Sequence, residues 1–363
     1  VTATVKYKKG KKTVKKVLKA KVTVKKKKAA AKATKKPTTT KAPATTKAPA
    51  TTKKPVATKV PTVTKTPVPA RTPEADPKPA NVVADGKVSD SNLTTEHKSR
   101  YGAVTKDNGM MRTNLSAQDI TPAMGMGWNI GNSLEQTGAG SIETMTDAEK
   151  AALTDADWVK GYETNAGNPV STQKLFSGLK RYGINTIRIP IAWSNMMVQE
   201  KQSDGSTYYR INEAYFDRVE EVINYCLNEE MYVIINDHWD GQWWGMFGDA
   251  DLSVRAQAWK KYEDMWTQIA NRYIDYSDRL IFEGANEELG ERLNDNWKGT
   301  GGTKGVLTRK ETYALTNEIN QKFVDIIRKS GINADGTKNN NYYRMLSVSY
   351  THLRAHETKA NLV

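Results

Sequence analysis

The stretch RLIFEGANE, residues 279–287, joins an apolar run to polar residues at its carboxyl end. Asn286 and Glu287 close the stretch, and Glu288 follows directly. A carboxylate at the end of a buried strand costs free energy unless a partner or a reaction requires it. The stretch therefore predicts a buried strand whose carboxyl end carries chemistry.

Other segments repeat this pattern, and a helical pattern precedes each of the last four. The predicted strands are residues 124–133, 186–193, 231–239, 279–287 and 343–350. The predicted helices are residues 172–182, 212–229, 253–275 and 309–329. Strands joined by long helices pair in parallel, and strands covered on both faces are almost continuously apolar, as these are. The predicted fold class is α/β with a parallel sheet.

Two parallel architectures compete for this pattern. A doubly wound nucleotide-binding sheet needs a glycine-rich loop after its first strand. The glycines of GMGWNIG (125–131) have the wrong spacing for that loop, and GTGGTKG (299–305) lacks the Gly-Lys-Ser/Thr order of a phosphate-binding loop. A (β/α)8 TIM barrel fits better, because its strands converge on one site at their carboxyl ends. The polar strand-end residues are Asn132, Trp193, Asp237, His238, Trp239, Asp240, Asn286 and Glu287. About five of the eight strands are recognisable, so the prediction is a partial barrel.

The positive charge of the chain is concentrated at its N-terminus. Residues 1–80 hold 24 Lys and Arg against two acids, a net +22, while the whole chain is +15, so residues 81–363 are net −7. The globular part therefore gives no reason to expect a nucleic-acid partner. No apolar run approaches the roughly 20 residues of a membrane span. The single cysteine excludes an internal disulfide.

The composition divides the chain into four parts. Residues 1–28 carry two alternating β-branched runs around a KKGKK turn, which predicts the last hairpin of a possible immunoglobulin-like module. Residues 29–81 form a Lys/Thr/Pro-rich linker, with a proline at every sixth position, that is expected to be extended and disordered. Residues 82–348 are assigned to the barrel. Residues 349–363 do not continue the pattern and are interpreted as a doubtful, non-native tail.

Glu287 has the position expected of a glycosidase acid. A glycosidic bond breaks when one carboxylic acid protonates the leaving oxygen and a second carboxylate stabilises or attacks the sugar carbon. The acid needs a desolvated setting or a negative neighbour to stay protonated. Asn286, beside it, can hydrogen-bond a sugar hydroxyl. Taken alone, the segment is also compatible with an ordinary solvated loop.

Two further polar residues lie within or at the end of predicted strands. Arg188 lies inside the apolar strand TIRIP and needs an anion, either a site carboxylate or a structural ion pair. His238 ends the third strand, where it is either a site residue or a satisfied structural group. A metal centre is not expected, because His238 and Asp240 lack a third ligand at a metal-binding spacing.

Three tryptophans follow the third predicted strand in HWDGQWWGMFG. Trp239, Trp243 and Trp244 are interpreted as a stacking surface for pyranose rings, with local loop packing as the alternative. Flat apolar rings match the apolar faces of sugars. The tryptophans therefore favour a carbohydrate ligand.

Four motifs in this order, GMGWNIGNSLE, GINTIRIPIAW, YVIINDHWDG and LIFEGANE, resemble glycoside hydrolase family 5, a family of retaining endoglucanases. The resemblance covers residues 110–347 and implies a (β/α)8 barrel that uses no cofactor. It implies that Glu287 is the acid/base. The implied substrate-binding residues are Arg188, His238 and Asn286, to which Asn132, Trp239, Trp243 and Trp244 are added as strand-end and loop candidates. Glu288 replaces the usual proline, and Trp239 stands where many members have a second histidine.

The nucleophile of that family is a second Glu at the end of the seventh strand. The two carboxyl groups of a retaining enzyme lie roughly 5–5.5 Å apart, and the recognisable pattern ends before that strand. The sequence thus predicts an N-terminal fragment of the catalytic barrel, truncated before the nucleophile strand. By itself this fragment is expected to fold poorly and to hydrolyse nothing.

The predicted partner is a β-1,4-glucan polysaccharide, met outside the cell or at the cell surface. Mannan, xyloglucan and mixed-linkage glucan stay open as substrates, and further modules are expected in the longer protein. A second hypothesis is a carbohydrate-binding or wall-associated protein without catalysis. The tryptophans and the basic linker would serve both hypotheses equally.

Overall fold

The computed structural model describes residues 2–9, 12–19, 96–238, 240, 243–295 and 304–349. The chain divides into two compact units, Val1–Arg71 and Thr72–Val363. The predicted linker, Trp239 and residues 350–363 of the predicted tail lie outside the described residues.

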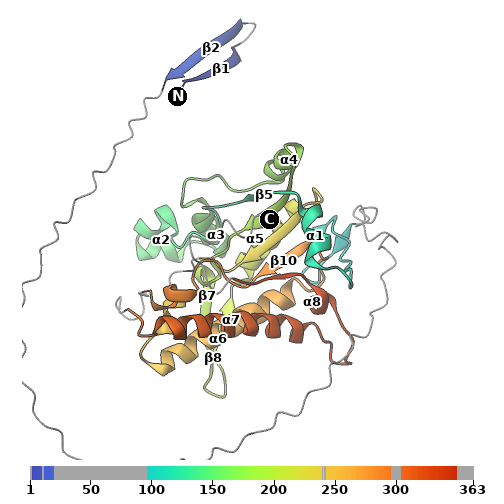
Figure 1. The fold of residues 1–363 in the computed structure, drawn as a ribbon. Helices are drawn as coiled ribbons and strands as arrows, with labels where there is room; N and C mark the ends of the chain where they lie inside the picture. The colour runs from blue at the N-terminus through green and yellow to red at the C-terminus, as the bar shows by residue number, and fades with distance from the viewer. Residues whose placement is uncertain are drawn as a thin grey trace, which may run out of the picture. The chain divides into compact units, whose positions relative to one another are not determined.

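The first unit contains the two strands that the sequence predicted. Strand β1 (Thr2–Lys9) pairs antiparallel with β2 (Lys12–Lys19), as Figure 1 shows in blue. The register runs from Thr2 opposite Lys19 to Lys9 opposite Lys12. Membership of an immunoglobulin-like module stays a prediction.

The second unit is built on a five-stranded sheet whose neighbouring strands are all parallel. Its strands are β5 (Met126–Asn129), β6 (Ile184–Ile189), β9 (Tyr232–Asn236), β10 (Leu280–Glu283) and β11 (Leu346–Ser347). Their order is β11-β10-β9-β6-β5, so β5 and β11 form the two edges. The five predicted strands are all present, but each is shorter than predicted, and the residues at the predicted carboxyl ends lie beyond the sheet.

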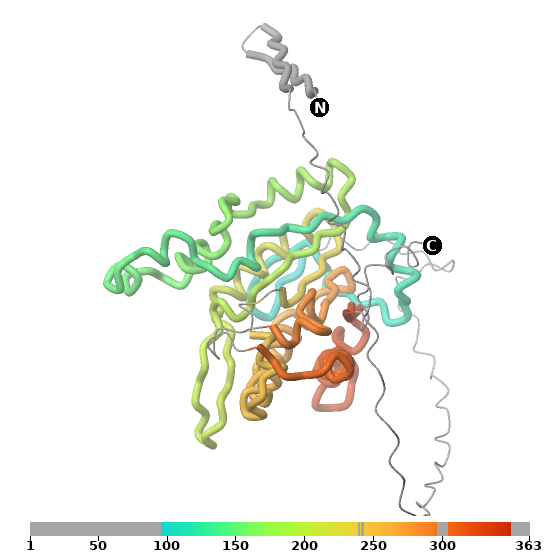
Figure 2. The backbone as a smooth tube through the Cα atoms, turned by 60° about the vertical axis from the view of Figure 1, so that its left-hand side comes forward, coloured from blue at the N-terminus to red at the C-terminus, as the bar shows by residue number. Residues whose placement is uncertain are grey.

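The four predicted helices are present close to their predicted bounds. They are α4 (Gln173–Arg181), α5 (Glu213–Leu227), α6 (Leu252–Arg272) and α7 (Arg309–Ser330). Side-chain oxygens start three of them: Asn212 caps α5, Asp251 caps α6, and Thr308 forms a capping box with Glu311 at α7. Figures 1 and 2 show α6 and α7 packed side by side.

Several short elements were not predicted from the sequence. The strands among them are β3 (His97–Lys98), β4 (Val104–Thr105), β7 (Met197–Lys201) and β8 (Thr207–Ile211). The α-helices are α1 (Ala117–Met124), α2 (Asp147–Ala151), α3 (Asp155–Thr164) and α8 (Asn340–Tyr343). The 3-10 helices are η1 (Gly140–Thr144), η2 (Trp193–Met196), η3 (Trp243–Gly248) and η4 (Gly290–Asn294). Their brief periodicity gives little sequence signal. In Figure 2 the β7–β8 hairpin projects from the unit in yellow-green.

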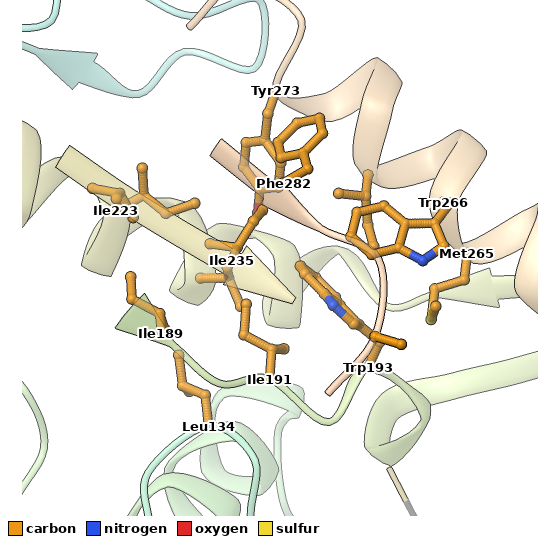
Figure 3. Close-up of a cluster of buried hydrophobic side chains, with 14 of the residues drawn as sticks. Leu134, Ile189, Ile191, Trp193, Ile223, Ile235, Met265, Trp266, Tyr273 and Phe282 are labelled. Atoms are coloured by element: carbon orange, nitrogen blue, oxygen red, sulfur yellow. The ribbon is translucent and has the colours of Figure 1, made fainter. Parts of the chain in front are cut away.

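One face of the sheet packs against the long helices. Figure 3 shows Ile189, Ile235 and Phe282 from adjacent strands gathered with Trp193 and with Trp266 of α6. Because side chains alternate along a strand, the residues between them belong to the opposite face. There Tyr232 and Ile281 form a smaller cluster with α1. None of the helices in the described part of the chain is long and apolar enough to cross a bilayer.

Candidate active site

The polar residues at the carboxyl ends of the strands lie on the sheet face opposite the long helices. The register sets Asn129 of β5 beside Arg188 of β6, and Asn236 of β9 beside Glu283 of β10. Each alternates with a core residue of the other face, as Arg188 does with Ile189. The strand ends therefore collect cationic, anionic and amide groups on one surface.

Arg188 is the centre of this surface. Its guanidinium donates from Nε to Glu283 Oε2 at 2.6 Å and from Nη2 to Glu283 Oε1 at 3.0 Å. It also donates from Nη1 to Asn129 Oδ1 at 2.9 Å and from Nη2 to Asn286 Oδ1 at 2.8 Å. The predicted anionic partner of Arg188 is thus Glu283, and the arginine fixes the orientation of the Asn286 amide.

Asn286 is held from both its backbone and its side chain. Its N–H donates to Glu288 Oε2 at 2.9 Å, and Glu288 is only 3% exposed. Because Asn286 Oδ1 accepts from Arg188, the Nδ2 group of Asn286 points away from the guanidinium. Glu288, at the position where the resemblance led us to expect proline, therefore anchors the segment that carries Glu287.

Glu287 lies at the open side of this surface. Its side chain is 71% exposed and pairs with Arg292 Nη1 at 3.0 Å. The sequence predicted a desolvated setting or a negative neighbour for this acid. Within the described residues Glu287 is instead solvated and paired with a cation.

His238 lies at the end of β9 beside the same arginine. Burial, followed by the positive charge of Arg188, lowers the pKa of His238 to about 4. Its Nδ1 lies 3.3 Å from Asn236 Nδ2, and its backbone N–H donates to the Ile191 carbonyl at 2.9 Å. If the amide donates, Nδ1 is the acceptor and Nε2 carries the proton. His238 is therefore a neutral hydrogen-bonding group near neutral pH.

Among the described contacts, the side chain of Asn132 bonds to Gln136. It is exposed in a turn with φ of 58°, and its Oδ1 accepts from Gln136 Nε2 at 3.2 Å. Asn129 takes the place beside Arg188 because it pairs in register with it. The predicted substrate-binding role of Asn132 has no support from these contacts.

The expectation that Trp243 and Trp244 form an open sugar platform is wrong for the described structure. They are 4% and 2% exposed and stack on each other with ring centroids 4.9 Å apart. They lie in η3, which packs against α6, and their indole N–H groups donate to Asp240 and Asp237. Local packing, the alternative reading, accounts for both rings.

Sequence reasoning missed four residues of the site: Asn129, Asn236, Glu283 and Glu288. Asn129, Asn236 and Glu283 lie within predicted apolar strands, where no role was predicted for them. The alternation of side chains along a strand could have identified them, since Arg188, Asn236 and Glu283 lie on the same face of the sheet in the observed register. Among the described residues, no group of three His, Cys, Asp or Glu could hold a metal ion.

The arrangement suits recognition of a hydroxyl-rich ligand. A fixed guanidinium, an oriented amide and a neutral imidazole offer directional donors and acceptors. Glu287 adds a carboxyl group that no neighbour buries. The surface therefore combines fixed hydrogen-bonding groups with the exposed carboxyl group of Glu287.

Known proteins resemble the chain over this region. The model of the cellulase family, glycosyl hydrolase family 5, matches residues 147–342. The chain is 32% identical over 245 residues to a xyloglucan-specific endo-beta-1,4-glucanase of Bacteroides ovatus, covering 68% of this chain and 41% of that protein. It is 35% identical over 218 residues to endoglucanase A of Clostridium longisporum, covering 60% of this chain and 36% of that protein.

A solved structure of a broad-specificity endoglucanase from Clostridium cellulovorans is 33% identical, with a TM-score of 0.46. The match covers 67% of this chain and 56% of that one. The chain spans about two fifths of the length of the two curated relatives.

Proposed function

The chain belongs to glycosyl hydrolase family 5, and from this premise we propose that it is part of an enzyme that cleaves β-1,4-linked glucan with retention of configuration. The hydrogen bond from Arg188 to Asn286, the residue before Glu287, carries the proposal. It joins residues from two motifs that are far apart in the sequence. Both matched the family by sequence alone.

Each polar residue has a role in the proposed reaction. Glu287 donates a proton to the leaving oxygen and later accepts one from water. The Nδ2 group of Asn286 donates to a sugar hydroxyl, and the neutral imidazole of His238 binds a second hydroxyl. Arg188 keeps the amide of Asn286 in place and supplies positive charge beside the reacting carbon.

A retaining mechanism also needs a nucleophilic carboxylate. Glu283 is a poor candidate, because both of its oxygens accept from Arg188. We therefore expect the nucleophile from a later strand of a completed (β/α)8 barrel, of which β5, β6, β9, β10 and β11 would be the first five strands. The exposed edge at β5, where Trp128 is 55% exposed, is consistent with a further neighbouring strand.

The proposed substrate is a polysaccharide with a β-1,4-glucan backbone. Xyloglucan is one candidate, since a relative is named for it; mannan and mixed-linkage glucan are others. A polymer of this kind is met outside the cell, so the proposal includes secretion. The Lys-rich segment 1–80 and any further modules would then act outside the cell as well.

The test measures hydrolysis and binding separately. In the protein that carries this chain, Glu287→Gln is expected to lower the release of reducing ends from carboxymethylcellulose and xyloglucan at least ~100-fold. Cello-oligosaccharide affinity should stay within about twofold. Unchanged hydrolysis in this variant would contradict the role of Glu287. Residues 1–363 alone are expected to release no sugar.

A carbohydrate-binding protein without catalysis is the second candidate. The exposure of Glu287 and its pairing with Arg292 favour it, because these contacts supply neither the desolvated setting nor the negative neighbour expected around a catalytic acid. The two candidates differ in one result. The longer protein would bind glucan equally well in both cases but release reducing ends only as an enzyme.

A further inference from the structure

Asp237 is a buried acid immediately before His238 that faces the helix side of the sheet. Its side chain is fully buried, and its Oδ2 accepts from Trp244 Nε1 at 2.9 Å. Its Oδ1 is buried and has no hydrogen-bond donor among the described residues. A buried carboxylate oxygen without a donor is costly.

Asp240 is the second buried acid of this segment, and donors surround it. Its carboxylate accepts from the Ser194 N–H at 2.8 and 3.0 Å, from Ser194 Oγ at 2.6 Å, and from Trp243 Nε1 at 3.1 Å. These donors satisfy both carboxyl oxygens of Asp240. The carboxyl group of Asp237 lies against that of Asp240.

The charge balance around the pair leaves one acid without a counterion. The titratable groups that face it are Glu288 after β10, Lys261 and Tyr262 in α6, and Tyr215 in α5. Burial, followed by the Asp240 charge, raises the pKa of Asp237 well above its ordinary value. Burial also lowers the pKa of Lys261, against the attraction of Asp240 and Asp237. Two adjacent carboxylates cannot both ionise easily in such a setting.

We propose that Asp237 is a neutral carboxylic acid whose O–H group donates a hydrogen bond to the carboxyl group of Asp240. This hydrogen bond positions His238. The proton makes Asp237 Oδ1 a donor, which explains why no other donor reaches it. Asp240 is bound in turn to Ser194, while the N–H of His238 donates to Ile191. The shared proton thus ties the end of β9 to the segment that follows β6.

Asp237 is a positioning residue in this account, since it acts on the sugar site only through His238. Its importance for catalysis rests on the proposed function. The position of the Asp237 proton does not rest on that function, so it can be tested by protein stability and spectroscopy on the protein that carries this chain, without any activity assay.

Asp237→Asn is the informative variant, because an amide is isosteric with a protonated carboxyl. Its NH2 group can donate to Asp240 while its oxygen accepts from Trp244. An acid whose folded pKa is raised loses stability as pH rises from its unfolded pKa, near 3.9, toward the folded value. Relative to the variant, the wild-type unfolding constant is therefore expected to rise about tenfold per pH unit over that window.

Urea unfolding of both proteins between pH 5 and 8 measures this difference. Parallel curves, or a variant that is unfolded at pH 7, would overturn the proposal. Asp264→Asn is the matched control: Asp264 is also a buried aspartate, but it pairs with Lys260 at 2.5 Å. Its amide variant is expected to be less stable than wild type at pH 7.

Two spectroscopic measurements complete the test. The Asp237 Cγ resonance, identified by its loss in Asp237→Asn, is expected at the protonated position at pH 7. An ionised position would contradict the proposal. Asp237→Leu is expected to shift the His238 ring signals and to speed exchange of its amide at least tenfold, whereas Asp237→Asn should restore both. Equal effects of the two variants would exclude the positioning role.

Discussion

Arg188 and Glu283 form a two-point ion pair across the polar face of the sheet, although 95 positions separate them in the chain. Arg188 belongs to β6 and Glu283 to β10, and β9 lies between these strands. The pair therefore spans a strand at the level of Ile234, which is the register neighbour of Arg188. The pair uses Nε and one N–H of Nη2, and the second N–H of Nη2 donates to Asn286. The ion pair therefore also sets the orientation of the Asn286 amide.

Removal of the Arg188–Glu283 pair should lower the free energy of unfolding more than removal of an exposed ion pair with the same N–O distance. Glu283→Ala is expected to lower the free energy of unfolding by ~1.5–3 kcal/mol, because it leaves a largely buried guanidinium without its anion. Glu200→Ala is the control: Glu200 pairs with Arg210 at the same 2.6 Å but with side chains 38% and 41% exposed. That variant should lose less than about 1 kcal/mol. Urea unfolding measures both, and equal losses would contradict the prediction.

Glu288 is expected to hold the Asn286 backbone through the hydrogen bond that its side-chain oxygen accepts, and not through its negative charge. Glu288→Ala removes the acceptor for the Asn286 N–H and should lower the free energy of unfolding by about 1–3 kcal/mol. Exchange of the Asn286 amide should speed up in the same variant. Glu288→Gln keeps a side-chain oxygen and should restore most of the protection. Fast exchange in both variants would show that the charge of Glu288 is essential.

His238 should make the protein acid-sensitive. Its folded pKa of about 4 lies below the ordinary unfolded value, so the unfolded chain takes up the proton first. Stability is therefore complete above pH ~6.5 and falls as the pH drops toward 4. His238→Gln carries no titrating ring and should lose less stability over that window. Urea midpoints at pH 7 and 4.5 for the two proteins test this, and identical pH dependence would refute it.

The buried tryptophans should matter for folding more than for sugar binding. Trp244→Ala is expected to cost about 3–5 kcal/mol, as large-to-small changes in a packed core do. Trp128→Ala removes a ring that is 55% exposed, so its cost should be within about 1 kcal/mol. Thermal unfolding compares the two variants. A small loss for Trp244→Ala would show that η3 is not part of the stable core.

Arg344 should be among the residues most needed for stability. Its fully buried guanidinium donates to the carbonyls of Tyr273, Tyr276, Ser277 and Leu280, at 2.8–3.0 Å. Arg344→Met removes one charged donor from each of these carbonyls and is expected to lower the free energy of unfolding by at least ~3 kcal/mol. Arg309→Met, at a surface arginine 54% exposed, is the control and should change stability by less than about 0.5 kcal/mol. Comparable losses would contradict this role.

The order of strands and helices was accessible from the sequence because it depends on local periodicity. The apolar runs at Tyr232–Asn236 and Leu280–Glu283 and the helix caps at Asn212 and Thr308 are all encoded within a few residues. The short hairpin β7–β8 was not accessible. Its strands have little periodicity of their own and are stabilised by pairing with each other.

The sequence by itself determined a parallel α/β sheet and the presence of Arg188, His238, Asn286 and Glu287 at or near strand ends, since apolar runs repeat at helix and strand spacing. Its four motifs also resembled the family to which the chain belongs. Only the tertiary structure decided which partners these strand-end residues meet. It joined Arg188 to Glu283 and Asn129, and it buried Trp243 and Trp244 against α6. The physical reason is that register and burial depend on residues far apart in the chain, whose separation no local pattern records.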